Sequence, residues 1–191
     1  QGTLANLVIC VQFSDSDDAH DIFGKAEHWE KVMGMYDTAK DSFKNYIKAI
    51  SDQKLTINNL FPQQTQKDGK TICAALRLDK NADYYKSNES ALVLDVILAI
   101  QDGKIALGGE KLDYREPGVL DNLTIIVQGS ASSMSDGFWP HSAVYSGYEE
   151  IGSGVLVRGY NLLNSDNLIR TLTSSVNVSG AQGTIAHEFL H

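Results

Sequence analysis

The last five residues of the chain, 187 to 191, read His-Glu-Phe-Leu-His and combine two imidazoles with one carboxylate. In a helix, where each residue advances by about 100°, His187 and His191 lie on one face, and imidazoles at this spacing can bind one metal ion. Glu188 projects in another direction, so it is too far round for a third ligand in the same row but can reach a water molecule on the metal. The pattern therefore predicts a metal site with His187 and His191 as ligands and Glu188 as general base.

The chemistry that these residue types favour is hydrolysis assisted by zinc. Neutral imidazole is a good zinc ligand, and a catalytic zinc keeps one position open for water, whose pKa it lowers to about 7. Glu188 could then accept a proton from this water and pass it to the leaving group. The alternative is a solvated surface helix whose terminal histidines only complement the helix dipole.

Two features of the preceding residues favour an ordered helix. Ser179 and Gln182 fit a capping box, in which the two side chains bind the free amides of the first turn. Ile185 and Phe189 fall on the side opposite the histidines and can anchor the helix to a core. These features favour the metal site over the solvated helix.

The rest of the chain supplies the elements that must position this helix. Apolar runs rich in branched residues predict buried strands, and apolar residues at helical spacing predict helices. The predicted strands are Leu4–Phe13, Lys54–Phe61, Leu123–Gln128 and Val155–Leu163; the predicted helices are Thr38–Ile50, Ser90–Gln101 and the terminal segment; the predicted loops are Gln63–Lys70 and Gly129–Trp139. This order predicts a single α/β domain with a mixed sheet over residues 1–191.

The composition narrows the class of protein further. With 42% apolar and 21% charged residues, the chain has the composition of a soluble globular protein, and its net charge of -8 argues against a nucleic-acid partner. No apolar run approaches the roughly 20 residues of a transmembrane helix. Cys10 and Cys73 lie in apolar surroundings, where free buried thiols are common, and a disulfide between them stays open as an alternative.

Several segments carry a resemblance when they are taken in order. They are Leu7–Asp15, with its final Phe-Ser-Asp; Phe43–Phe61; Asp121–Gly129; the Phe-Trp-Pro-His of residues 138–141; and Gly183–His191. In this order they resemble the opening strand, the first helix and its following strand, the core strand, the Trp-x-His element and the active-site helix of the immune inhibitor A family. This family comprises secreted bacterial zinc metallopeptidases, and the similarity extends over nearly the whole chain.

The resemblance implies a zincin-like, metzincin-type N-terminal subdomain. In such a fold a twisted mixed sheet with packed helices backs the C-terminal active-site helix, and substrate lies extended along an edge strand, held by main-chain hydrogen bonds. It also implies an endopeptidase, secreted or at the cell surface, that cleaves extracellular proteins. Residues 1–191 would form the upper half of the catalytic domain, with the third zinc ligand and the lower half beyond His191. By its position, Val155–Leu163 is either the edge strand or a central core strand.

The chain also departs from the family pattern. Leu190 stands where relatives often have Gly, and the third ligand is absent. Asp113–Asp121 occupies the place of a calcium-like loop but contains Arg115 and Pro117, so calcium is not expected. In the Trp-Pro-His element, Trp139 is expected in the core, whereas His141 either lines the cleft or serves as a structural hydrogen-bond donor.

The function implied for this chain is therefore that of a zinc endopeptidase with an incomplete site. Two imidazoles leave zinc under-coordinated, so the 191-residue chain is expected to bind zinc weakly and to hydrolyse proteins poorly. Two other functions stay open. One is a zincin-like binding or adhesion module that has lost catalysis, and the other is a metallohydrolase that acts on a non-peptide substrate.

Overall fold

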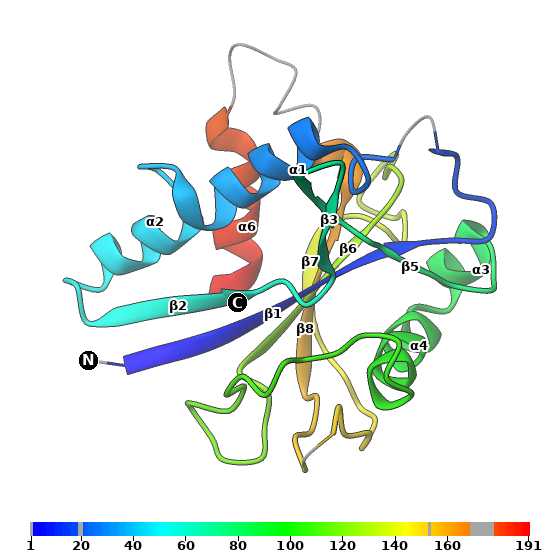
Figure 1. Ribbon diagram of the computed structural model, residues 1–191. Coiled ribbons are helices and arrows are strands. Elements are labelled where there is room, and N and C mark those ends of the chain that lie inside the picture. The colour runs from blue at the N-terminus through cyan, green and yellow to red at the C-terminus, as the bar shows by residue number, and fades with distance from the viewer. Residues whose placement is uncertain (1, 19–20, 153, 169–177) are drawn as a thin grey trace.

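A single main sheet organises the structure. The computed structural model describes residues 2–18, 21–152, 154–168 and 178–191, the last range without the side chains of 178–180. The sheet contains β1 (Gly2–Gln12), β2 (Leu55–Leu60), β5 (Leu76–Arg77), β6 (Asn122–Val127), β7 (His141–Val144) and β8 (Gly159–Asn164). Their order is β2-β1-β6-β8-β7, and β5 pairs with the end of β1 (Figure 1). Only β7 is antiparallel to its neighbour.

Helices cover both faces of this sheet, which explains why β1 is apolar without alternation. Leu7, Ile9 and Val11 point into one core with α3 (Ala82–Ser87) and α4 (Glu89–Gln101). Val8 and Cys10 point into the other, with α1 (Ala26–Met33), the π-helix η2 (Gly34–Thr38), α2 (Phe43–Ile50) and α6 (Val178–Leu190). Figure 1 shows α2 and α6 on one side of the strands and α3 and α4 on the other. A strand buried on both faces has no polar face to expose, hence the continuous apolar run.

The expected α/β class with a mixed sheet is confirmed, and the sheet is mostly parallel. Two local predictions need correction. The region predicted as helix from Thr38 is divided into η2 and α2, because Ser42 caps a new helix by accepting a hydrogen bond from the Asn45 amide. The predicted loop Gln63–Lys70 contains most of a hairpin, β3 (Gln64–Lys67) with β4 (Lys70–Cys73). Its first strand is exposed throughout, so it carries no apolar signal.

The structure also shows whether the strand predicted at Val155–Leu163 lies at the edge or in the centre of the sheet. It is shorter, Gly159–Asn164, and lies between β6 and β7, so it is a central strand. The edge strand is β7, which falls just after the predicted loop and had no strand signal of its own.

The terminal helix is present as predicted, and its rear face anchors it. Ile185 is 3% exposed and packs with Ala181 and Ala186 in the core on the α2 side. The Phe189 ring meets the Phe43 ring of α2 edge-on, with centroids 5.0 Å apart. The predicted capping residue Ser179 has a side chain outside the described part of the structure.

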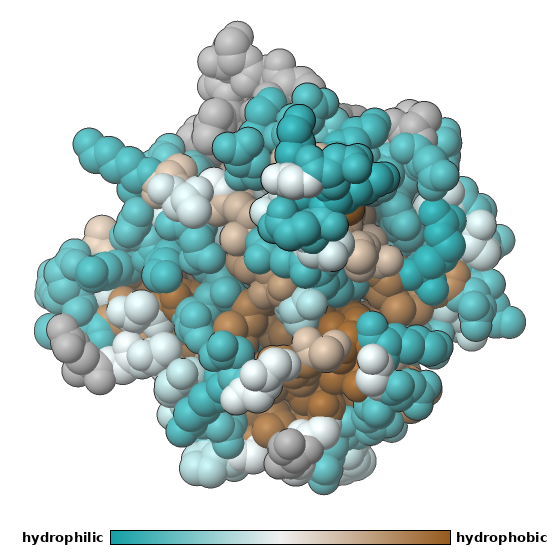
Figure 2. Space-filling model, viewed as in Figure 1, coloured by the Kyte–Doolittle hydropathy of each residue, from teal (hydrophilic) through white to brown (hydrophobic). Residues whose placement is uncertain are grey.

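The surface shown in Figure 2 is largely hydrophilic, with an apolar area below its centre. Among the described residues, no helix combines the length and the apolar character needed to cross a membrane.

Candidate metal centre

The two histidines of the terminal motif converge as the sequence predicts. The Nε2 atoms of His187 and His191 lie 3.0 Å apart. Two imidazole nitrogens that bind one tetrahedral zinc at about 2.0–2.1 Å would lie about 3.3 Å from each other. Only a small rotation of the rings separates the two arrangements, so the pair fits a shared metal ion.

Glu188 completes a group of three side chains that could hold a metal. The ligand atoms of His187, Glu188 and His191 all lie within 4.8 Å of one another. The histidines are exposed, whereas Glu188 is only 7% exposed. A carboxylate that is mostly shielded from water beside two accessible imidazoles can act on a small molecule bound between them.

The end of α6 is held in place by a side chain of the sheet. With its amide oriented to suit its neighbours, Asn161 of β8 donates from its nitrogen to the Glu188 carbonyl at 3.1 Å and to the Ser142 hydroxyl at 3.2 Å. The last carbonyls of a helix lack partners within the helix. Asn161 supplies one to the residue predicted as general base, so the motif is tied directly to β8 and, through Ser142, to β7.

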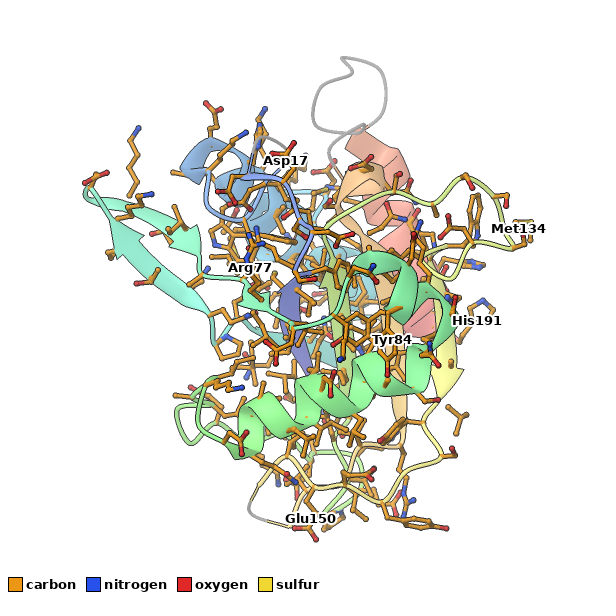
Figure 3. All side chains as sticks on the ribbon, turned by 90° about the vertical axis from the view of Figure 1, so that its right-hand side faces the viewer. Asp17, Arg77, Tyr84, Met134, Glu150 and His191 are labelled. Atoms are coloured by element: carbon orange, nitrogen blue, oxygen red, sulfur yellow. The ribbon has the colours of Figure 1, made fainter. Side chains whose placement is uncertain are left out.

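The candidate metal-binding group of His187, Glu188 and His191 borders a groove of about 800 Å³. The groove extends from the end of α6 across β7 and β8 to the loop before β7, which contributes Met134 and Trp139. In Figure 3, His191 and Met134 lie on the same side of the molecule. A second hollow of about 560 Å³ reaches the same two histidines from the α2 side, next to Tyr46 and Leu190. Both histidines are therefore accessible from two directions.

The edge strand presents free main-chain groups to this groove. The Tyr145 amide, one residue beyond β7, donates to the Arg158 carbonyl in the direction of β8. Because successive residues of a strand alternate in direction, the main-chain groups of Ser142 and Val144 face away from β8. Val144 is 85% exposed. An extended peptide could pair with these groups beside the metal-binding group.

His141 lies in the same groove, with both of its ring nitrogens engaged. Nε2 lies 2.7 Å from a carboxylate oxygen of Glu89, and Nδ1 lies 2.7 Å from the Trp139 carbonyl oxygen. Both partners accept hydrogen bonds, so the ring satisfies them best as an imidazolium that donates twice. The Tyr160 hydroxyl donates to the same Glu89 oxygen. Neither nitrogen of His141 is free for a metal in this arrangement.

The pKa shifts of this network agree with a charged pair. The hydrogen bond to Glu89 raises the pKa of His141 above its usual range, although partial burial acts in the opposite direction. Burial raises the pKa of Glu89, but the hydrogen bonds from His141 and Tyr160 outweigh burial and hold it below its usual range. Burial and Glu89 both raise the pKa of Tyr160, which stays a neutral donor. The network joins the start of α4 to β7 and β8.

The structure thus brings together His187, Glu188, His191 and His141, all lining one groove. It places Trp139 differently from the prediction: the side chain is 38% exposed and lines the groove, because Pro140 leads directly into an edge strand. Sequence reasoning missed Asn161, Glu89 and Tyr160. Each acts through a contact with a residue distant in sequence, and no local pattern marks them.

The loop Asp113–Asp121 uses its carboxylates within the protein. Asp121 accepts hydrogen bonds from the amides of Ala5, Tyr114 and Arg115, and Asp113 accepts one from Gly118. These contacts fasten the loop to the start of β1. Both side chains therefore already have a structural function.

No protein-family model matches the chain, and no curated protein matches it.

Proposed function

We propose that this chain is the metal-binding part of a zinc-dependent endopeptidase of the zincin type. The observation that carries the proposal is the convergence of the His187 and His191 nitrogens, 3.0 Å apart, beside the shielded Glu188 in an open groove. The resemblance of the ordered segments to the immune inhibitor A family supports the same class and adds an exported protein, secreted or at the cell surface.

Substrate recognition would use the free edge of β7. A peptide in extended form would pair with the main-chain groups of Ser142 and Val144, which gives affinity without dependence on side-chain identity. The exposed ring of Trp139 and the exposed Met134 at the far end of the groove would contact substrate side chains. This mode of binding suits an enzyme that acts on proteins rather than on small molecules.

Catalysis would use the three residues of the motif in distinct roles. His187 and His191 would hold the zinc, which would supply an acidified water nucleophile and polarise the peptide carbonyl. Glu188 would accept the proton of the attacking water and donate it to the departing amine. Asn161 would keep Glu188 in position through its hydrogen bond to the Glu188 carbonyl.

The proposal requires a third zinc ligand. Catalytic zinc sites use three protein ligands and one water, and the group found among the described residues offers two imidazoles and the general base. His141 is directed to Glu89 and Trp139 instead. The family that the chain resembles supplies this ligand from a third residue.

Hydrolysis of a fluorogenic peptide library by the zinc-loaded protein tests the proposal. Glu188→Gln is expected to lower kcat/KM by about 10²–10⁴-fold, the usual range for a general base, while zinc content stays the same. Glu27→Gln is the matched control, because Glu27 is an exposed carboxylate of α1. Full activity in Glu188→Gln would refute the role of this residue. Zinc binding without cleavage of any peptide would instead favour the adhesion module or the non-peptide hydrolase.

A further inference from the structure

Two cysteines distant in sequence meet in the core on the α2 side of the sheet. Cys10 lies within β1 and is 1% exposed, and Cys73 is the last residue of β4 and is 2% exposed. Both belong to the same cluster of buried side chains. The Cys73 thiol lies close enough to raise the pKa of the Cys10 thiol, and both cysteines are free.

Hydrogen bonds of the Gln63 side chain and main chain hold the two backbones near each other. The Gln63 side chain takes the place of a neighbouring strand beside Cys10, since it accepts from the Cys10 amide at 2.7 Å and donates to the Cys10 carbonyl at 2.9 Å. The Gln63 carbonyl accepts from the Ala74 amide at 2.9 Å. Cys73 is paired with Gln64, next to Gln63. These bonds place the backbones of Cys10 and Cys73 on either side of Gln63, so the two cysteines are kept near each other.

We propose that Cys10 and Cys73 are a disulfide-forming pair, which an oxidant of the disulfide class converts into an intramolecular cross-link. A thiolate of one cysteine attacks the oxidant RSSR, forms a mixed disulfide and releases one RS⁻. The second cysteine attacks the protein sulfur of that mixed disulfide and releases the other RS⁻. In sum, two protein thiols lose two electrons and two protons, and the oxidant becomes two RSH molecules.

The surroundings determine when this reaction takes place. Burial raises the pKa of the Cys10 thiol, and the Cys73 thiol raises it further, so the folded protein holds little reactive thiolate there. Cys73 lies at the end of a hairpin whose other strand is exposed throughout, so opening of this hairpin would uncover it first. Oxidation is thus expected during folding or local opening rather than in the closed structure.

The cross-link would fasten the β3–β4 hairpin, and α1 that packs on it, to the central strand β1. A disulfide stabilises by restricting the unfolded chain, and the effect increases with the length of the closed loop. The loop from residue 10 to residue 73 is long. The inference does not depend on the metal centre, because neither cysteine belongs to the metal-binding group or the groove.

Refolding of the reduced 191-residue chain in a buffer of oxidised and reduced glutathione tests the proposal. Non-reducing peptide mapping by mass spectrometry is expected to yield one linked pair that contains Cys10 and Cys73. The Tm of the oxidised chain is expected to exceed that of the reduced chain by about 5–10 °C, and added reductant should reverse the difference. Oxidation of the already folded chain should be markedly slower.

Cys73→Ala and Cys10→Ala serve as matched controls, and neither should show a redox-dependent Tm. Should either variant fail to fold, the comparison of oxidised and reduced wild-type chain still decides. Both thiols free to alkylation after refolding with oxidised glutathione, or cross-links only between molecules, would overturn the proposal.

Discussion

Removal of His191 gives the most direct test of the proposed metal centre. Zinc binds to a structural site with four ligands with a free energy of about 10–16 kcal/mol, hence about 2.5–4 kcal/mol for each ligand. The two converging imidazoles would then provide about 5–8 kcal/mol, which corresponds to a Kd between about 200 μM and 1 μM. His191→Ala leaves one imidazole and should weaken the Kd beyond about 1 mM.

Isothermal titration of the metal-free 191-residue chain with zinc near neutral pH measures both values. His28→Ala is the control, because His28 lies in α1 and is not part of the metal-binding group. A nanomolar Kd for the unaltered chain would show that the site is already complete and would refute the reasoning on ligand number. Equal affinity in His191→Ala would remove the site from the terminal helix altogether.

Three further predictions concern the elements that support the site. Val144→Pro removes a main-chain donor of β7 that faces away from β8. The KM for peptides should rise about fivefold, as for one lost hydrogen bond of about 1 kcal/mol, while the Tm stays unchanged. An unchanged KM would exclude edge pairing at Val144. Ile185→Ala leaves a cavity at a buried position beneath α6 and should lower the free energy of unfolding by about 2–5 kcal/mol, seen as a Tm loss of about 5–15 °C. Ile50→Ala, at a 53% exposed position, should change the free energy of unfolding little. Glu89 raises the pKa of His141, so the stabilisation from this pair is present below about pH 6.5 and is lost as the pH rises through the raised pKa. Thermal unfolding of the metal-free protein across pH should show this decline in stability. The variant His141→Gln should abolish the decline.

The charged network at His141 shows how contacts distant in sequence bear on the two roles that the sequence left open, a residue of the cleft or a structural hydrogen-bond donor. A histidine beside a glycine-rich loop is compatible with catalysis or metal binding. In the structure, Glu89 and the Trp139 carbonyl occupy both ring nitrogens. The residue then acts by fixing the start of β7 to α4, and through β7 it influences the groove.

The amino-acid sequence by itself determined the features that depend on short separations along the chain. The i, i+4 spacing of His187 and His191 brings their rings to one helix face wherever the helix is placed, and the opposite position of Ile185 makes that helix an anchored one. The continuous apolar run of β1 likewise indicated a strand covered on both faces.

Only the tertiary structure decided which distant segments meet. The pairing of β7 with β8 made β7 the edge strand and β8 a central strand. Strand order depends on which segments hydrogen-bond to each other across the sheet and not on the residues of either strand alone. The proximity of Cys10 to Cys73 in one buried cluster and the bond from Asn161 to the Glu188 carbonyl arise in the same way. Interactions between residues far apart in sequence leave no periodic pattern in either segment, so only the folded structure reveals them.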